Sequence, residues 1–302
     1  MASVTPDWID RKLYPFRHGT RDVAGHRLHY VDEGDGPTLL LLHGNPTWSF
    51  VWRNVIARLA GEFRFVAPDL PGFGLSEAPA GFDGRPVSLA AVIEQFVIDL
   101  DLTDVVLVAQ DWGGPIGLRV AERRPDRFTG LVLGNTWAWP VTGDRHFARF
   151  SALMGGPVGR WWIRHANLCV NLMIPAGHRR RSLTRDEMRH YRAALATPER
   201  RQASAVLPRE IVHSAPFLAD VEAGLPLLRD KPALLLWADR DIAFRRTELD
   251  RWRRELPDAT VVELAGAGHY LQSDAPAEFA DALRTWHRAV TGARGASGAA
   301  TD

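Results

Sequence analysis

Cysteine and long apolar runs are scarce in this sequence. Cys169 is the single cysteine among 302 residues, so no disulfide can form within the chain, which suits a reducing cytoplasm. No apolar run approaches the ~20 residues that a membrane-spanning helix needs. The opening residues, MASVTPDWIDRKLYPF, contain no apolar signal-peptide segment. We therefore expect a cytoplasmic chain without a membrane partner.

An excess of either charge is also absent. The 37 basic and 36 acidic side chains give a formal net charge of +1, which argues against a nucleic acid or a membrane surface as the main partner. The arginine-rich segment HRRRSLTRDEMRHYR, residues 178–192, carries acidic residues as well. A solvated helix face or a contact between subunits explains this segment better than a nucleic-acid site, so self-association of the chain stays open.

Short apolar runs alternate with segments of helical periodicity. Several of the runs are apolar at every position, as are strands buried on both faces of a parallel sheet. One segment between them, Ser88–Leu100, has apolar residues at helical spacing. The alternation predicts an α/β fold, with a mostly parallel sheet flanked by helices. The expected strands are His29–Val31, Leu39–His43, Phe65–Pro68, Val105–Ala109, Leu131–Gly134, Leu234–Ala238 and Val261–Leu264.

The stretch from 141 to 225 interrupts this alternation. It is rich in arginine, tryptophan and helix-forming residues, and it falls between two expected strands. We interpret residues 141–225 as a helical cap over the carboxyl edge of the sheet, and residues 1–140 and 226–290 as the core domain. Residues 291–302 hold no core-forming side chains and predict a disordered tail.

An aspartate occupies an unusual position in LVAQDWGGPIG, residues 107–117. The apolar run ends at Gln110, and Asp111 is followed by Trp112 and two glycines before a helical pattern begins. A tight turn from a buried strand into a helix exposes its middle residue and requires small neighbours. The N-terminus of the following helix favours an anion there. Asp is also a good helix N-cap, which explains the residue about as well when it is taken alone.

Two later loops supply partners for Asp111. The strand in LLLWADRDIAF leads into Asp239 and Asp241, and the strand in VVELAGAGHYLQ leads to His269. The order of nucleophile, acid and histidine is the one expected for an α/β-hydrolase fold. All of these residues follow the carboxyl ends of strands, where open α/β sheets build their sites. The sequence therefore predicts a nucleophilic hydrolase rather than a helix cap at Asp111.

The choice of aspartate as nucleophile indicates the bond that is attacked. A carboxylate attacking a saturated carbon leaves an ester, which water activated by histidine can hydrolyse. The leaving group would be a halide or the oxygen of an epoxide. An epoxide calls for O–H donors from the cap, yet Tyr191 is the only one of the four tyrosines between 141 and 225. A halide calls for N–H donors, which the indole of Trp112 and the amide of Asn45 can supply.

Other residues admit a structural explanation. Trp112 could be a packed core aromatic, and Asn45 a turn residue before Pro46. Asp69, with Gly72 and Gly74, is interpreted as a turn that shapes the sheet. Four more tryptophans could line an apolar pocket or pack in the core: Trp137, Trp139, Trp161 and Trp162.

Five motifs in order, HGNPTW, PDLPGFGLS, QDWGG, WADRD and AGHYLQ, resemble haloalkane dehalogenases of the α/β-hydrolase superfamily over residues 20–140 and 226–290. The resemblance implies that Asp111 is the nucleophile and that His269 is the base that activates water. It implies that Asn45 and Trp112 hold the halide, and that their backbone N–H groups form an oxyanion hole. Since Asn135 occupies the earlier of the family's two acid positions, the W-x-x-x-D pattern implies Asp241 as the acid.

The same resemblance implies a small apolar halogenated substrate, release of a halide ion, and no metal or organic cofactor. The combination of an Asp–His–Asp triad with an Asn–Trp halide pair is similar to one subfamily. Three rival functions each predict a different site. An epoxide hydrolase would place two cap tyrosines at Asp111, and a dehalogenase of halo-acids would aim arginines at the pocket. A catalytically silent binding protein would turn His269 away from Asp111.

Overall fold

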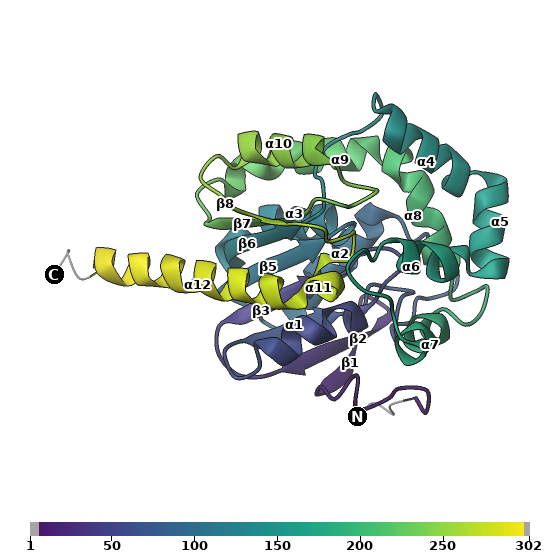
Figure 1. Ribbon diagram of the computed structural model, residues 1–302, viewed down its shortest axis with the longest axis horizontal. Helices are drawn as coiled ribbons and strands as arrows, with labels where there is room; N and C mark the ends of the chain where they lie inside the picture. The colour runs from purple at the N-terminus through teal and green to yellow at the C-terminus, as the bar shows by residue number, and fades with distance from the viewer. Residues whose placement is uncertain (1–5, 299–302) are drawn as a thin grey trace.

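An eight-stranded sheet lies at the centre of the computed structural model, which describes residues 6–298 (Figure 1). Its strands run in the order β1-β2-β4-β3-β5-β6-β7-β8. Strand β2 pairs antiparallel with both β1 and β4, and β3 to β8 pair parallel with one another. The predicted mostly parallel sheet is thereby confirmed. The strands are β1 (His18–Val23), β2 (His26–Glu33), β3 (Thr38–Leu42), β4 (Arg64–Pro68), β5 (Val105–Gln110), β6 (Phe128–Gly134), β7 (Ala233–Ala238) and β8 (Thr260–Leu264).

Each predicted strand overlaps one of β2 to β8, whereas β1 was not predicted. The sequence of β1, HGTRDV, is largely exposed or half-buried and contains no apolar run. It is held by a hairpin to β2, in which Ala24 and Gly25 both have positive φ. This geometry is typical of the two-residue turns that fit the twist of paired strands.

Both faces of the sheet are covered, as the continuous apolar runs predict. Leu40 and Leu42 belong to one buried apolar cluster, and Leu39 and Leu41 to the other. On the first face α2 packs against α3, and on the second α1 packs against α12. The predicted helix Ser88–Leu100 is confirmed as α2. The helices of the core are α1 (Arg53–Arg58), α2 (Pro86–Asp99), α3 (Gly113–Arg123), α10 (Arg246–Glu255), α11 (Leu271–Asp274) and α12 (Pro276–Gly298), with short helical turns at Ser49–Trp52, Pro125–Arg127 and Leu225–Leu228.

The described residues between β6 and β7 form helices and connecting loops, and the structure places no strand among them. Figure 1 shows α4 to α8 gathered on one side of the sheet. We keep the name cap for residues 141–225, as an interpretation of this insertion. The helices are α4 (Arg145–Gly155), α5 (Pro157–Ala166), the π-helix η3 (Cys169–Met173), α6 (Ile174–Ala176), α7 (Arg185–Ala194), α8 (Gln202–His213) and α9 (Ala215–Gly224).

The predicted tail needs a correction at its start. Helix α12 continues through Gly298, so residues 291–298 are helical rather than disordered. A helix that has already formed gains one hydrogen bond with each residue it adds, so α12 can extend beyond the last core-forming side chain. The rest of the predicted tail, 299–302, lies outside the described residues.

Over residues 6–298 we find no single helix long and apolar enough to cross a bilayer. The pair α8 and Ala215–Leu228 would qualify together by length and composition, with a bend of 71° between its members.

The turn at Asp69 has the structural role predicted for it. The buried carboxylate accepts hydrogen bonds from His29 Nδ1 and from the backbone N–H groups of Ser49 and Leu75, each at 2.8 Å. A Cβ at Gly74 would lie 2.2 Å from Asp69 Oδ2. Asp69 therefore fixes the chain beyond β4 and leaves no side-chain room at Gly74.

A buried ion pair links α1 of the core to α7 of the cap. Arg53, 2% exposed, donates to Glu187 through Nη2 and to the Phe50 carbonyl through Nη1 at 3.0 Å. Glu187 also accepts from Arg181 and from the Thr184 backbone at 2.8 Å. Burial opposes ionisation of Glu187, but its hydrogen bond with Arg181 and the charge of Arg53 lower its pKa to about 2.

A second buried carboxyl, that of Glu122, lies where α3 meets α9. Gly224 leaves it room, since a Cβ there would lie 2.3 Å from Glu122 Cδ. Burial raises the pKa of Glu122 to about 8, against the opposing hydrogen bond from Arg119. At neutral pH the folded protein therefore holds a proton on Glu122.

Wild type should lose stability as pH rises because of Glu122, and we expect the variant Glu122→Gln to lack this loss. Between the unfolded pKa near 4.5 and the folded pKa of about 8, only the folded state holds the proton. The free energy of unfolding contributed by this group is therefore highest below the lower value and falls as pH rises to the upper one. Urea unfolding at pH 5.5 and 8 should show wild type losing several kcal/mol more than the variant. Parallel pH profiles would contradict this account.

Candidate active site

Asp111 stands at the turn between β5 and α3. Its φ is 52°, in the left-handed region, and its backbone N–H donates to the Asn135 carbonyl at 3.1 Å. A Cβ at Gly113 would lie 2.3 Å from the Leu42 carbonyl oxygen, and one at Gly44 would lie 2.2 Å from Asp111 Oδ1. The neighbouring glycines are thus required by close backbone approaches, as the motif predicts. Helix α3 has Trp112 as its N-cap and no side-chain cap, so the N-cap explanation of Asp111 fails.

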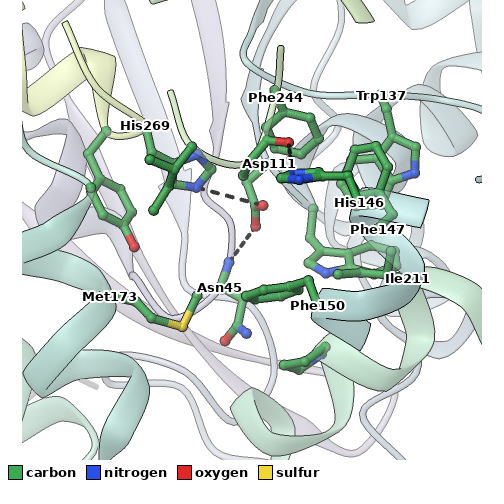
Figure 2. Close-up of a pocket in the computed structure, with 16 residues that line it drawn as sticks. Asn45, Asp111, Trp137, His146, Phe147, Phe150, Met173, Ile211, Phe244 and His269 are labelled. Atoms are coloured by element: carbon green, nitrogen blue, oxygen red, sulfur yellow. Dashed lines mark hydrogen bonds and ion pairs between the residues drawn. The ribbon is translucent and has the colours of Figure 1, made fainter. Parts of the chain in front are cut away.

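The Asp111 carboxylate lies between two backbone donors and a histidine. Asn45 N–H donates to Oδ1 at 2.8 Å, and Trp112 N–H also donates to the carboxylate. On the other side, His269 Nε2 lies 3.8 Å from Oδ2 (Figure 2). The histidine thus faces Asp111, which is opposite to what a catalytically silent fold predicts.

The structure brings Asp241, rather than Asp239, to the histidine. Asp241 Oδ2 lies 2.9 Å from His269 Nδ1 and accepts from Asn135 Nδ2 at 2.7 Å. Its Oδ1 accepts from the Ala243 backbone at 2.6 Å. Asp239 instead accepts from the Gly266 backbone at 2.5 Å. Asn135, which stands at the earlier of the two positions considered for an acid, therefore donates a hydrogen bond to Asp241 at the later position.

Burial and charge act in opposite directions on the two central groups. Burial raises the pKa of Asp111, while the charge of His269 and the two backbone donors counteract the rise. Burial opposes protonation of His269, but attraction to Asp241, with smaller help from Asp111, raises its pKa above the ordinary value. Asp241 therefore makes His269 a stronger base.

Asn45 and Trp112 both line the cavity next to Asp111. Among the described residues, none accepts a hydrogen bond from the indole N–H of Trp112. Asn45 Nδ2 donates to the carbonyl of Ser204 at 3.3 Å, and its Oδ1 is buried without a partner. One amide N–H of Asn45 is therefore engaged by the cap, and the other is left for a ligand.

The cavity in front of Asp111 has a volume of about 120 Å³ and a mainly apolar wall. Of the four tryptophans considered from the sequence, only Trp137 lines it. Trp139 packs against Trp252, and Trp161 and Trp162 are exposed on α5. Figure 2 shows how the side chains surround the carboxylate. The lining residues that sequence reasoning missed include His146, Phe147, Phe150, Met173, Pro208, Ile211, Phe244 and Tyr270.

Part of this lining could have been found from spacing. Phe147 and Phe150 lie three residues apart on α4, as two residues on one face of a helix do. Met173 reaches the cavity from the π-helix η3, which no sequence pattern announced. Gln110 was also missed. Its Nε2 lies 3.1 Å from both the carbonyl oxygen and Nε2 of His269, and so helps to hold the loop that carries this histidine.

The cavity does not match the two rival enzymes. Tyr270 is the only tyrosine among its described lining residues, and the cap's Tyr191 is not one of them. An epoxide hydrolase with a pair of cap tyrosines is therefore not favoured. The lining also contains no arginine or lysine to bind the carboxylate of a halo-acid. No cluster of three potential metal ligands occurs in residues 6–298, and the expectation of no cofactor stays a prediction.

Known proteins resemble the chain over nearly its whole length. Residues 37–276 match the model of the alpha/beta hydrolase fold family. Haloalkane dehalogenase 2 of Mycobacterium tuberculosis is 44% identical over 278 residues, which cover 91% of this chain and 96% of the relative. A cis-3-alkyl-4-alkyloxetan-2-one decarboxylase of Shewanella oneidensis is 31% identical, with 88% and 86% covered.

The solved structures that resemble the chain include haloalkane dehalogenases, like the first of these relatives. The haloalkane dehalogenase DbeA from Bradyrhizobium elkani superposes with a TM-score of 0.83 at 29% identity, covering 92% of this chain and 99% of that one. Sequence and structure thus lead to the same group of enzymes. The chain belongs to the haloalkane dehalogenase family of α/β hydrolases.

Proposed function

We propose that the protein hydrolyses the carbon–halogen bond of small haloalkanes through an alkyl ester on Asp111. One observation carries the proposal: a carboxylate at a strand-to-helix turn faces His269 across 3.8 Å, inside a mainly apolar cavity. The identity to haloalkane dehalogenase 2 supports it.

In the first step Asp111 Oδ2 attacks the halogen-bearing carbon. A C–O bond forms while the carbon–halogen bond breaks, and the halide departs with the bonding electron pair. The indole N–H of Trp112 and the free amide N–H of Asn45 stabilise the negative charge on the leaving halide. Each such donor contributes about 3 kcal/mol in well-studied active sites.

In the second step His269 takes a proton from water, and the resulting hydroxide attacks the ester carbonyl. Asp241 holds the histidine and stabilises its protonated form. The backbone N–H groups of Asn45 and Trp112, which already contact the carboxylate, stabilise the oxyanion. Collapse of the intermediate frees the alcohol and restores Asp111, and His269 returns its proton to solvent.

The cavity volume limits the substrate. An apolar cavity of about 150 Å³ takes up benzene, so the 120 Å³ cavity suits a slightly smaller, short-chain haloalkane.

Cytoplasmic location and self-association of the chain stay predictions. Exposed Trp161 and Trp162 on α5 would favour self-association, and light scattering on the purified chain would test it.

We expect Asp111→Asn to abolish halide release from 1,2-dibromoethane and 1-bromobutane. The neutral amide is a poor nucleophile, and loss of a nucleophile typically costs about 10⁶-fold in turnover. Halide is measured in the medium with wild type beside the variant. No release by wild type would contradict the proposal, and styrene oxide opening and β-lactone decarboxylation would then be assayed.

A further inference from the structure

A proline stands inside the cap helix α8 and faces the cavity. Pro208 is buried and lies in the middle of Gln202–His213, where a proline usually destabilises a helix. Proline has no backbone N–H, so the hydrogen bond that residue 208 would give to the carbonyl of residue 204 cannot form. The Ser204 carbonyl is thus left without its usual helical partner inside a buried region.

That carbonyl accepts the side chain of Asn45 instead. Asn45 Nδ2 donates to Ser204 O at 3.3 Å, across 159 positions of sequence. This is the only hydrogen bond of the amide within the described chain, because Oδ1 is buried without a partner. The hydrogen bond to the Ser204 carbonyl is therefore the contact that fixes which way round the Asn45 amide lies, with its N–H₂ group toward Ser204.

We infer that Pro208 is a positioning residue for Asn45: by lacking an N–H, it keeps the Ser204 carbonyl available to orient the amide toward a halide. An amide turned by 180° would place its oxygen toward the halide and repel it. The inference rests on the proposed function, in which Asn45 binds the departing halide. It also explains why α8 keeps a residue that disfavours helices.

The test is the affinity for bromide alone, measured by quenching of tryptophan fluorescence, in wild type and Pro208→Ala. Alanine restores the N–H, which competes with Asn45 for the Ser204 carbonyl. Because one neutral hydrogen bond is involved, we expect about three- to tenfold weaker bromide binding. The melting temperature should rise, since the helix regains a hydrogen bond. A purely structural role of Pro208 would not combine higher stability with weaker binding.

A matched control separates the effect of restoring the N–H from the effect of losing the proline ring. Lactic acid at position 208 provides the methyl side chain of alanine but an ester oxygen in place of the N–H. We expect this protein to bind bromide as wild type does. Equal weakening in the alanine and lactic acid proteins, or none in the alanine variant, would overturn the inference.

The proposed function fails on a different result. If wild type neither binds bromide nor releases halide, the dehalogenase mechanism itself is wrong. If wild type does both and Pro208→Ala binds bromide equally well, only the positioning role is wrong. In kinetics, the alanine variant should lower kcat for bromoalkanes more than it raises KM, because the departing halide carries its charge only in the transition state.

Discussion

His269→Gln should release one equivalent of halide per active site and then almost stop. Alkylation of Asp111 needs no base, so the first step still proceeds. Hydrolysis of the ester needs a proton acceptor for water, and glutamine cannot serve as one. Loss of a catalytic histidine typically costs about 10⁶-fold in turnover. Rapid-quench halide assays should show the burst, and intact mass should show the protein plus one alkyl group.

Two comparisons sharpen this prediction. Asp241→Asn leaves the imidazole in place but removes the charge that raises the pKa of His269, so slow turnover should persist after the burst. Wild type at acid pH should resemble His269→Gln, because a protonated imidazole cannot accept a proton. Since the folded pKa of His269 is raised, this accumulation of ester should begin at a higher pH than for an ordinary histidine. A variant that turns over normally would contradict the assignment of the base.

Glu187→Gln should give the largest loss of stability. The change leaves the charge of buried Arg53 without its counter-ion, and breaking a buried ion pair from one side costs about 3–5 kcal/mol. The pair also joins α1 to α7, so the loss should loosen the cap from the core. Urea unfolding at pH 7 measures the effect as a lower free energy of unfolding.

The control is an ion pair on the surface. Glu263 contacts Arg246 at 2.7 Å, with the two side chains 38% and 59% exposed. Glu263→Gln should cost less than about 1 kcal/mol, because solvent screens such pairs. The pH dependence provides a further check. The lowered pKa of Glu187 means that its contribution is complete above about 4.5 and is lost as pH falls toward 2. Equal losses in the two variants would contradict the role assigned to burial.

The sequence predicted those strands and site residues that local patterns of residues encode. Apolar runs located β2 to β8, and the order of Asp111, Asp241 and His269 after three strand ends indicated residues that the structure brings together. Strand β1 was missed because edge strands need no apolar run. The bond from Asn45 to Ser204 was missed because no pattern in the sequence of α8 places the Ser204 carbonyl beside the loop after β3. The bond between Arg53 and Glu187 likewise depends on how the cap packs, which no local pattern specifies.

The cap is an insertion between β6 and β7, two strands that pair directly with each other. Because the two strands are parallel, the chain leaves the sheet at the carboxyl end of β6 and returns to it at the amino end of β7. Asp111, Asp241 and His269 are all carried by the part of the chain outside the insertion. Recombination could replace the whole insertion, and with it about half of the apolar wall, while Asp111, Asp241 and His269 stay where they are. A transplanted cap would have to meet two conditions: it must bring a carbonyl to Asn45 and a carboxylate to the buried Arg53.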